Sequence, residues 1–205
     1  IDYEDVKANI ADTTSLGHND MTEGSRGTFS SGMATIYAAR EAIEVLKQRA
    51  AITWGIPVED VAWEAGHAVA TGKGHGNLPK LSLREIAAKS GRTGGPIAGH
   101  NEVTADGAGM GFASHICDVE VDPETGRSTI VRYTVVQDAG KAINPDYVEG
   151  QFQGGATQGI GWALNEEYIY GADGRLQNPG FLDYRIPVCS DLPFIDTKIL
   201  EIPNP

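Results

Sequence analysis

The sequence predicts an α+β fold, with mixed sheets, hairpins and packed helices. One segment, residues 33–51, carries apolar residues at helical spacing, and another, residues 112–136, has two strand-like runs around a turn. Helices and hairpins follow one another without the regular strand–helix–strand alternation of a parallel sheet. We therefore expect an α+β domain that is part of a larger one.

The most clearly marked helix is expected from Met33 to Ala51. Ser30 or Ser31 can cap its start, and Lys47 and Arg49 suit the negative end of its dipole. Its apolar positions are Ile36, Ala39, Ile43, Leu46 and Ala50. This periodicity predicts one buried face.

The segments around this helix contain turn signals. Residues 6–11 read as a short strand, and residues 12–20 are dense in turn formers and predict a loop. The segment 1–6 resembles 56–61, with a Glu-Asp pair before a strand in each, which predicts two related helix–turn–strand units.

The stretch that follows predicts a capped short helix. Residues 72–76 form a glycine-rich tip, and Ser82-Leu-Arg-Glu85 is a capping box. A helix from Leu83 to Lys89 should end near Gly91, with a loop over 91–99.

The second half of the chain predicts strands. Residues 112–121 and 128–136 flank a turn with Pro and Gly, 122–127, and read as a hairpin. A second hairpin is expected to join 167–170 to 176–177, and a last strand covers 197–202. Two subdomains are predicted, helix–strand units over 1–110 and hairpins plus a glycine-rich helix over 111–205.

The glycine-rich helix is the most informative segment. It should begin at Pro145, with Val148, Phe152, Ile160 and Leu164 sharing one broad face. Each interior glycine costs about 1 kcal/mol relative to Ala. Such a sequence is tolerated where bare backbone approaches another backbone or a ligand closely. The glycines expected to interrupt the helix are Gly150, Gly154, Gly155, Gly159 and Gly161.

Composition narrows the function class. The 205 residues are 40% hydrophobic, enough for a packed core, and the formal net charge of −12 disfavours nucleic acid and anionic membranes. Cys117 and Cys189 are expected to be free, buried thiols of a cytosolic protein. The chain begins with Ile1 and ends in an apparent loop, so we expect a piece of a longer polypeptide.

The sequence lacks the motifs of several common binding and catalytic sites. The dinucleotide fingerprint, the phosphate loop and the nucleophile elbow do not occur. The five histidines are scattered without the close spacing of a metal-ligand set, so no residue is assigned as a metal ligand.

Two segments remain as candidates for a phosphate-bearing ligand. Gly24-Ser25-Arg26 lies in a loop whose backbone amides and arginine suit an anion, although an ordinary connecting loop explains it too. Lys141 and Asn144 lead into a helix start, which also suits an anion, although tight helix packing is an equal alternative.

These residues resemble the molybdenum-binding large subunit of the xanthine oxidase family of molybdenum hydroxylases. Gly24-Ser25-Arg26 is most similar to the carbon monoxide dehydrogenase and bacterial aldehyde oxidoreductase branches. The other matching segments are 136–145, 149–161, 182–187 and 196–205. The resemblance covers the whole chain and implies part of a molybdopterin-binding domain.

The resemblance implies a molybdenum–molybdopterin cofactor, in bacteria usually the cytosine dinucleotide, whose sulfurs hold the metal. The residues implied to bind this cofactor are Gly24, Ser25, Arg26, Gly140, Lys141, Asn144 and Gln151. The implied reaction oxidises an aldehyde or aromatic heterocycle with water as the oxygen source.

The resemblance also implies partners. These are the remainder of the large subunit and iron–sulfur and FAD subunits, with 2Fe-2S clusters and FAD, in the cytoplasm or alternatively the periplasm. The family's catalytic glutamate follows the segment that matches 199–205, so no residue here is assigned as catalytic and the piece is expected to be inactive alone. The alternative is a non-catalytic binding or assembly module of the same fold.

Overall fold

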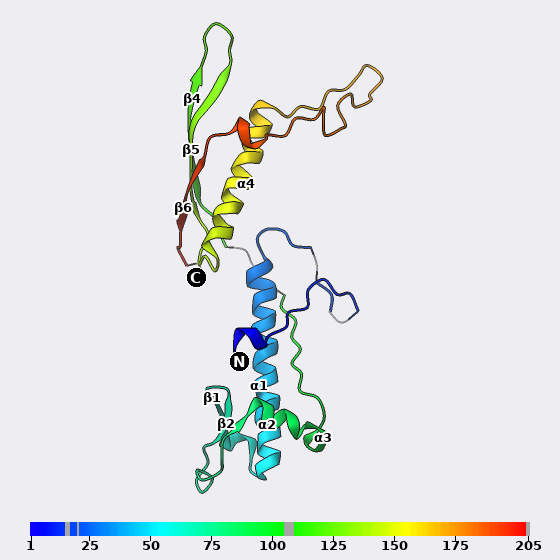
Figure 1. The fold of residues 1–205 in the computed structure, drawn as a ribbon, viewed down its shortest axis with the longest axis vertical. Coiled ribbons are helices and arrows are strands. Elements are labelled where there is room, and N and C mark those ends of the chain that lie inside the picture. Colours follow the sequence, from blue (N-terminus) through cyan, green and yellow to red (C-terminus); the bar gives the residue numbers. More distant parts are fainter. Residues whose placement is uncertain (15–16, 20, 105–108, 204–205) are drawn as a thin grey trace. The chain divides into compact units, whose positions relative to one another are not determined.

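The computed structural model describes residues 1–14, 17–19, 21–104 and 109–203. The chain divides into two compact units, Ile1–Asp106 and Gly107–Pro205. Both contain helices and a three-stranded sheet, so the α+β class is confirmed (Figure 1). The predicted segments 12–20 and 196–205 include residues 15, 16, 20, 204 and 205, which lie outside the described residues.

The first unit is built around the helix α1, Gly32–Trp54. Gly55 ends it with a left-handed φ of 70°, and its amide donates to Ala51 O over 2.8 Å. A π-helical turn, Gly27–Ser31, precedes it, and the Ser31 side chain makes no capping hydrogen bond. The predicted serine cap is therefore wrong, because the helical path already begins upstream of the serine pair.

An antiparallel sheet packs beside α1, with β1 (Val61–Glu64), β2 (His67–Ala70) and β3 (Leu81–Ser82) in chain order. The capping box of Ser82 and Glu85 is confirmed and begins α2, Leu83–Ala88. A short helix α3, Ser90–Thr93, occupies the start of the predicted 91–99 loop. The core of this unit comprises Leu46, Ala50, Ala51, Val61, Ala68, Leu81 and Ile86.

Both Glu-Asp repeats form 3-10 helices, Tyr3–Asp5 and Val58–Asp60. Only the second leads into a strand, β1. The strand predicted over 6–11 is wrong, because these residues are exposed and pair with no strand of the described chain.

The second unit contains the long hairpin of β4 (Ala113–Val121) and β5 (Ser128–Asp138), as predicted. The strand β6, Ile195–Leu200, pairs with β5 in parallel. The helix α4, Pro145–Leu164, comes between β5 and β6 in the sequence and packs against their sheet (Figure 1). The sequence did not predict this β5–α4–β6 crossover. The second predicted hairpin reduces to a single bridge between Tyr170 and Leu176.

The helix α4 covers the sheet with one apolar face. Its core cluster comprises Val135, Phe152, Ala156, Ile160 and Ile195. Val148 is partly buried against this cluster, as expected, whereas Leu164 is 50% exposed. The crossover therefore places the start of α4 beside the carboxyl ends of β5 and β6, which point the same way.

Two further expectations concern the surface. Cys117 and Cys189 are free, as predicted, but both are exposed in this chain, so the predicted burial is wrong. Among the helices of the described residues, none has the length and apolar character needed to cross a bilayer.

Candidate functional site

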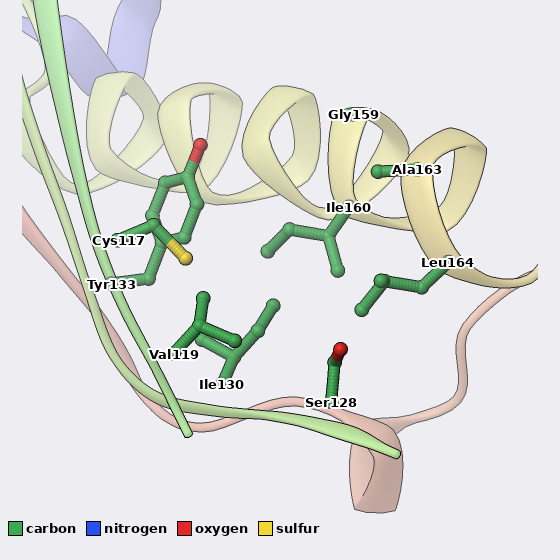
Figure 2. Close-up of a pocket in the computed structure, with 9 residues that line it drawn as sticks. All are labelled: Cys117, Val119, Ser128, Ile130, Tyr133, Gly159, Ile160, Ala163 and Leu164. Carbon is green, nitrogen blue, oxygen red and sulfur yellow. The ribbon is translucent and has the colours of Figure 1, made fainter. Parts of the chain in front are cut away.

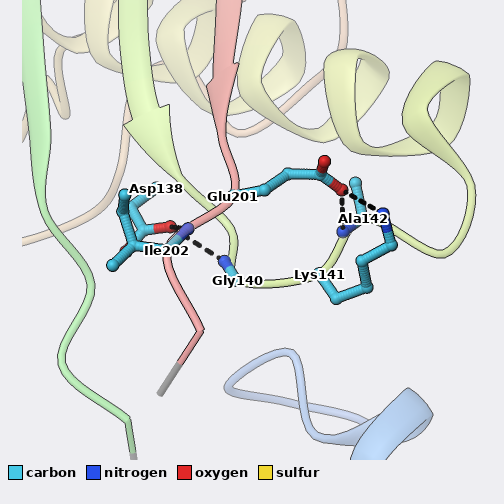
Figure 3. A network of polar contacts seen from close by, with 6 residues as sticks. All are labelled: Asp138, Gly140, Lys141, Ala142, Glu201 and Ile202. Carbon is cyan, nitrogen blue, oxygen red and sulfur yellow. Dashed lines mark hydrogen bonds and ion pairs between the residues drawn. The ribbon is translucent and has the colours of Figure 1, made fainter.

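The turn after β5 is held to the end of β6 by two carboxylates (Figure 3). Asp138 Oδ1 accepts hydrogen bonds from the amides of Gly140, over 2.9 Å, and Ile202, over 3.1 Å. Glu201 Oε1 accepts from Lys141 Nζ, over 3.1 Å, and from the Ala142 amide, over 2.9 Å. Gly140 has a φ of 59°, so the turn needs a residue that tolerates the left-handed region.

The ion pair leaves the lysine able to bind a second group. The hydrogen bond from Lys141, the Ala142 amide and the lysine charge together hold the pKa of Glu201 below its usual value. The Lys141 side chain is 76% exposed. An ammonium has three donors, so Lys141 can bridge Glu201 and an external anion.

Asn144 caps α4. Its Oδ1 accepts from the Tyr147 amide over 3.3 Å, and Pro145 fills the first helical position, where no amide is needed. Asp146 adds a negative charge to the first turn. The helix start is thus already partly satisfied, so the side chains are better placed than its amides to bind an anion.

Asn144 and Gln151 lie on the same flank of α4. A separation of seven residues is about two helical turns, roughly 10 Å along the axis. The Asn144 side-chain NH₂ has no hydrogen-bond partner among the described residues, and Gln151 is exposed. Both amide groups are therefore available to a ligand along this flank.

The glycines of α4 differ in their surroundings. A Cβ built at Gly161 would lie 2.6 Å from Pro187 Cδ and would also meet the Glu166 carboxylate. A Cβ at any of the other four would meet nothing within 4 Å in this chain; these are Gly150, Gly154, Gly155 and Gly159. Close packing within the chain therefore explains why residue 161 is a glycine, whereas the other four glycines lie on helix surface that no other described part of this chain covers.

The Gly24-Ser25-Arg26 segment is a tight turn in the first unit. Gly24 and Ser25 have φ values of 57° and 58°, and the Arg26 amide donates to Glu23 O over 3.2 Å. Two consecutive residues with positive φ are what a type I′ turn requires. Ser25 is a non-glycine residue held in this region, and such strain concentrates at functional sites.

The four predicted residues of the second unit lie in one stretch of the chain, with Gly140 and Lys141 in the turn after β5, Asn144 at the cap of α4 and Gln151 within α4. Gly24, Ser25 and Arg26 belong to the other unit, so their part in a common site stays a prediction. The sequence missed the roles of Asp138 and Glu201. An aspartate two residues before a turn glycine was an available signal for Asp138, whereas Glu201 lies 59 positions from its Ala142 partner.

A separate pocket of about 260 Å³ lies between the hairpin and the carboxyl-terminal half of α4 (Figure 2). Cys117, Tyr133 and Ser128 contribute its polar atoms, and aliphatic side chains make most of the wall. Burial, and then the neighbouring Cys117, raise the pKa of Tyr133. This pocket is at the opposite end of α4 from Asn144 and contains none of the predicted site residues.

Within the described parts of the chain, no group of three or more His, Cys, Asp or Glu side chains is arranged to hold a metal ion. The predicted donors in the turn and along the first half of α4 are an ammonium and two carboxamides. These groups suit phosphate and carbonyl oxygens better than a metal ion.

Comparison with known proteins identifies the family to which the chain belongs. Residues 1–193 match the molybdopterin cofactor-binding domain family. The chain is 32% identical over 186 residues to the gamma subunit of the 6-hydroxypseudooxynicotine dehydrogenase complex of Paenarthrobacter nicotinovorans, covering 86% of this chain and 23% of that protein. It is 31% identical over 196 residues to a xanthine dehydrogenase molybdenum-binding subunit of Escherichia coli O157:H7, covering 91% and 26%.

The fold is likewise similar to solved structures. The Cu,Mo-containing CO dehydrogenase aligns with a TM-score of 0.71 at 26% identity, covering 94% of this chain and 24% of that one. Quinoline 2-oxidoreductase from Pseudomonas putida 86 aligns with a TM-score of 0.67 at 31% identity, covering 90% and 24%. The chain spans about a quarter of the length of the relatives it matches. It belongs to the molybdopterin cofactor-binding domain family and corresponds to part of the large subunit of a xanthine oxidase family enzyme.

Proposed function

We propose that this chain supplies part of the cradle that holds molybdenum–molybdopterin in a hydroxylase or dehydrogenase. The observation that carries the proposal is a series of exposed donors, which begins with Lys141 and Asn144 at the carboxyl ends of β5 and β6 and continues along α4 to Gln151. When bound, the cofactor supplies two-electron oxidation of the substrate carbon.

Each residue has a role that its chemistry allows. Lys141 binds a phosphate oxygen with the donors that Glu201 leaves available. Asn144 donates from its NH₂ group while its oxygen caps α4, and Gln151 donates two turns further along. Gly140 permits the left-handed bend that sets the lysine beside the helix start.

The first unit contributes the strained turn. Gly24 and Ser25 are the two central residues of the Glu23–Arg26 turn, and backbone amides in such turns can bind an anionic or carbonyl oxygen. The Ser25 hydroxyl and the Arg26 guanidinium add donors of the kind that bind pterin and phosphate oxygens.

The cofactor carries a cytosine dinucleotide in this proposal, and its electrons pass to 2Fe-2S clusters and FAD on partner chains in the cytoplasm. These finer points follow from the family resemblance. The names of two relatives, the carbon monoxide dehydrogenase large chain and the dehydrogenase complex subunit gamma, support a multisubunit assembly.

The substrate class in this proposal is an aldehyde or an aromatic heterocycle. Support comes from the names of quinoline 2-oxidoreductase and nicotine 6-hydroxylase, since quinoline and the pyridine ring of nicotine are aromatic heterocycles. The nicotine enzyme's large subunit is 40% identical over 90 residues, covering 44% of this chain.

Elemental mass spectrometry of the complete protein, purified with its partner subunits, tests the proposal. We expect molybdenum and phosphorus bound in near-stoichiometric amounts, with iron from the clusters. Absence of molybdenum from protein made in a host that synthesises the cofactor would contradict the proposed enzymatic function and favour a non-catalytic binding module. Gln151→Ala should lower occupancy, and Gln177→Ala, outside the proposed cradle, is its control.

A further inference from the structure

We infer that Asp138 and Glu201 are positioning residues, which together form a reciprocal clasp that sets the Gly140–Ala142 turn and the Lys141 ammonium for the cofactor. The term clasp here means the four hydrogen bonds that these two carboxylates accept (Figure 3). The inference rests on the proposed function, because the turn is taken to face the cofactor.

The clasp continues the β5–β6 pairing past the end of the ladder. The last paired residues are Asp138 and Leu200, and the Ala139 amide still donates to Leu200 O over 3.0 Å. The backbone ladder ends at this point. The Asp138 carboxylate then accepts from the Ile202 amide, which follows β6, and the Glu201 carboxylate accepts from the Ala142 amide of the turn.

The arrangement is reciprocal, because each carboxylate crosses to the other segment. Asp138 Oδ1 accepts from Gly140 in its own turn and from Ile202 in the segment that follows β6. Glu201 Oε1 reaches in the other direction and binds both the backbone and the side chain of the turn. Two carboxylates thus fix the turn from both sides, whereas one would leave it able to pivot.

The location suits a ligand. The parallel strands β5 and β6 end at the same edge of the sheet, and the carboxyl ends of parallel strands are a recurring place for ligand binding. The helix α4 begins within a few residues of the clasp. Holding the turn therefore also sets where Asn144 enters the helix.

Glu201 also orders the lysine side chain. A free lysine stem has many rotamers, and restraining one end before binding removes part of the entropy lost on binding. Glu201 engages Lys141 through a single oxygen, so the ammonium keeps further donors for an anion. The charged group that faces Glu201 in this network is Lys141, whereas Asp138 binds the amide of the neighbouring residue, Ile202.

The test compares variants that remove the acceptors with variants that keep them. Asp138→Ala and Glu201→Ala remove the oxygens, whereas Asp138→Asn and Glu201→Gln keep one neutral acceptor each. Glu120→Ala on β4 and Asp196→Ala on β6 are the controls, because both side chains are exposed and have no ion pair or side-chain hydrogen bond in the described chain. All are made in the complete protein with its partner subunits.

Two readouts are measured on each variant, hydrogen–deuterium exchange of the peptide covering 138–144 and molybdenum and phosphorus per protein. We expect exchange of this peptide to rise about tenfold or more in the alanine variants, as for loss of a hydrogen bond to a charged group. Cofactor occupancy should fall about fivefold or more, in keeping with the loss of supporting interactions around a bound group. Asp138→Asn should restore most of both, and the two controls should match the wild type.

Two results in the alanine variants would overturn the inference. Faster hydrogen–deuterium exchange with full cofactor occupancy would mean that the clasp stabilises the turn but does not support cofactor binding. Unchanged exchange would show that the turn does not depend on the clasp. Wild-type protein without molybdenum would overturn the proposed function itself, and is recognised because it does not depend on any variant. If the alanine variants fail to fold, Glu201→Gln is the deciding variant, because it keeps an acceptor for the Ala142 amide but loses the ion pair with Lys141. Full cofactor occupancy in this variant would overturn the inference, and reduced cofactor occupancy would support it.

Discussion

The ring of Pro187 lies directly against the bare Cα face of Gly161 on α4. A Cβ at this position would approach Pro187 Cδ to 2.6 Å and would also meet the carboxylate of Glu166. Real Cβ atoms essentially never come this close to another atom, so one of the neighbours would have to move. Gly161 is thus required by its own chain, and Gly154, whose face is open, is not.

Gly161→Ala is expected to destabilise the protein. The gain in helix propensity is about 1 kcal/mol, and overpacking costs about 1–3 kcal/mol, so a net loss of roughly 1 kcal/mol is expected. Gly154→Ala is the matched control and should stabilise by about 0.5–1 kcal/mol. Urea unfolding of both measures the difference, and equal stabilisation by the two would mean that Pro187 moves aside freely.

The Tyr184 hydroxyl donates to Glu166 Oε2 over 2.8 Å, and this bond is the main reason that the pKa of Tyr184 is raised to about 12. The folded pKa lies above the ordinary value of 10.0. The stabilisation is therefore complete below pH 10 and is lost as the pH rises through about 12. Ultraviolet titration of phenolate should show a step near pH 12 in the wild type that is missing in Tyr184→Phe. If the step near pH 12 persists in Tyr184→Phe, the assignment is contradicted.

Local patterns predicted most elements correctly. The Ser82–Glu85 capping box and the Asp122–Arg127 turn are specified by residues a few positions apart, and both formed as expected. The strand at 6–11 failed because a strand needs a partner, and nothing in its own residues tells whether one exists.

The candidate site was predicted only in part for the same reason. Lys141 and Asn144 belong to a local motif, but the partner of Lys141 is Glu201, brought near by the parallel pairing of β5 with β6. That pairing joins segments about 60 residues apart, and no short-range pattern marks it. The sequence therefore proposed donors for the candidate site and missed the carboxylates that hold the turn and Lys141.

The Glu201–Lys141 pair should make stability depend on pH in a defined direction. The pKa of Glu201 is lowered from 4.5 by Lys141 and the Ala142 amide, so its stabilisation is present above about pH 4.5 and is lost as the pH falls through the folded pKa. The unfolding free energy of the wild type minus that of Glu201→Gln should be constant above this range and shrink below it. A difference that grows on acidification would reverse the sign and contradict the ion pair.

Arg49 should stabilise the first unit through two carbonyls. Its guanidinium donates to Thr93 O and, over 2.7 Å, to Gly94 O at the end of α3. Lysine cannot reproduce this forked geometry, so Arg49→Lys is expected to cost about 2 kcal/mol, the range for hydrogen bonds to a charged group. Arg84→Lys, at an exposed position of α2, is the control and should change stability by less than about 0.5 kcal/mol. Chemical denaturation compares the two, and similar small losses would mean that the clamp contributes little.

Ser25 offers the sharpest separation of stability from function. Its φ of 58° is strained for a residue with a Cβ, so Ser25→Gly should stabilise the protein by about 1 kcal/mol. If the hydroxyl binds the cofactor, the same change should lower molybdenum occupancy. Ala65, with a φ of 46° in the β1–β2 turn, gives the control, because Ala65→Gly relieves similar strain away from the proposed cradle. Opposite effects on melting temperature and occupancy in Ser25→Gly, but not in Ala65→Gly, would show that the strain at Ser25 is retained for ligand binding, whereas full occupancy in both would remove Ser25 from the cradle.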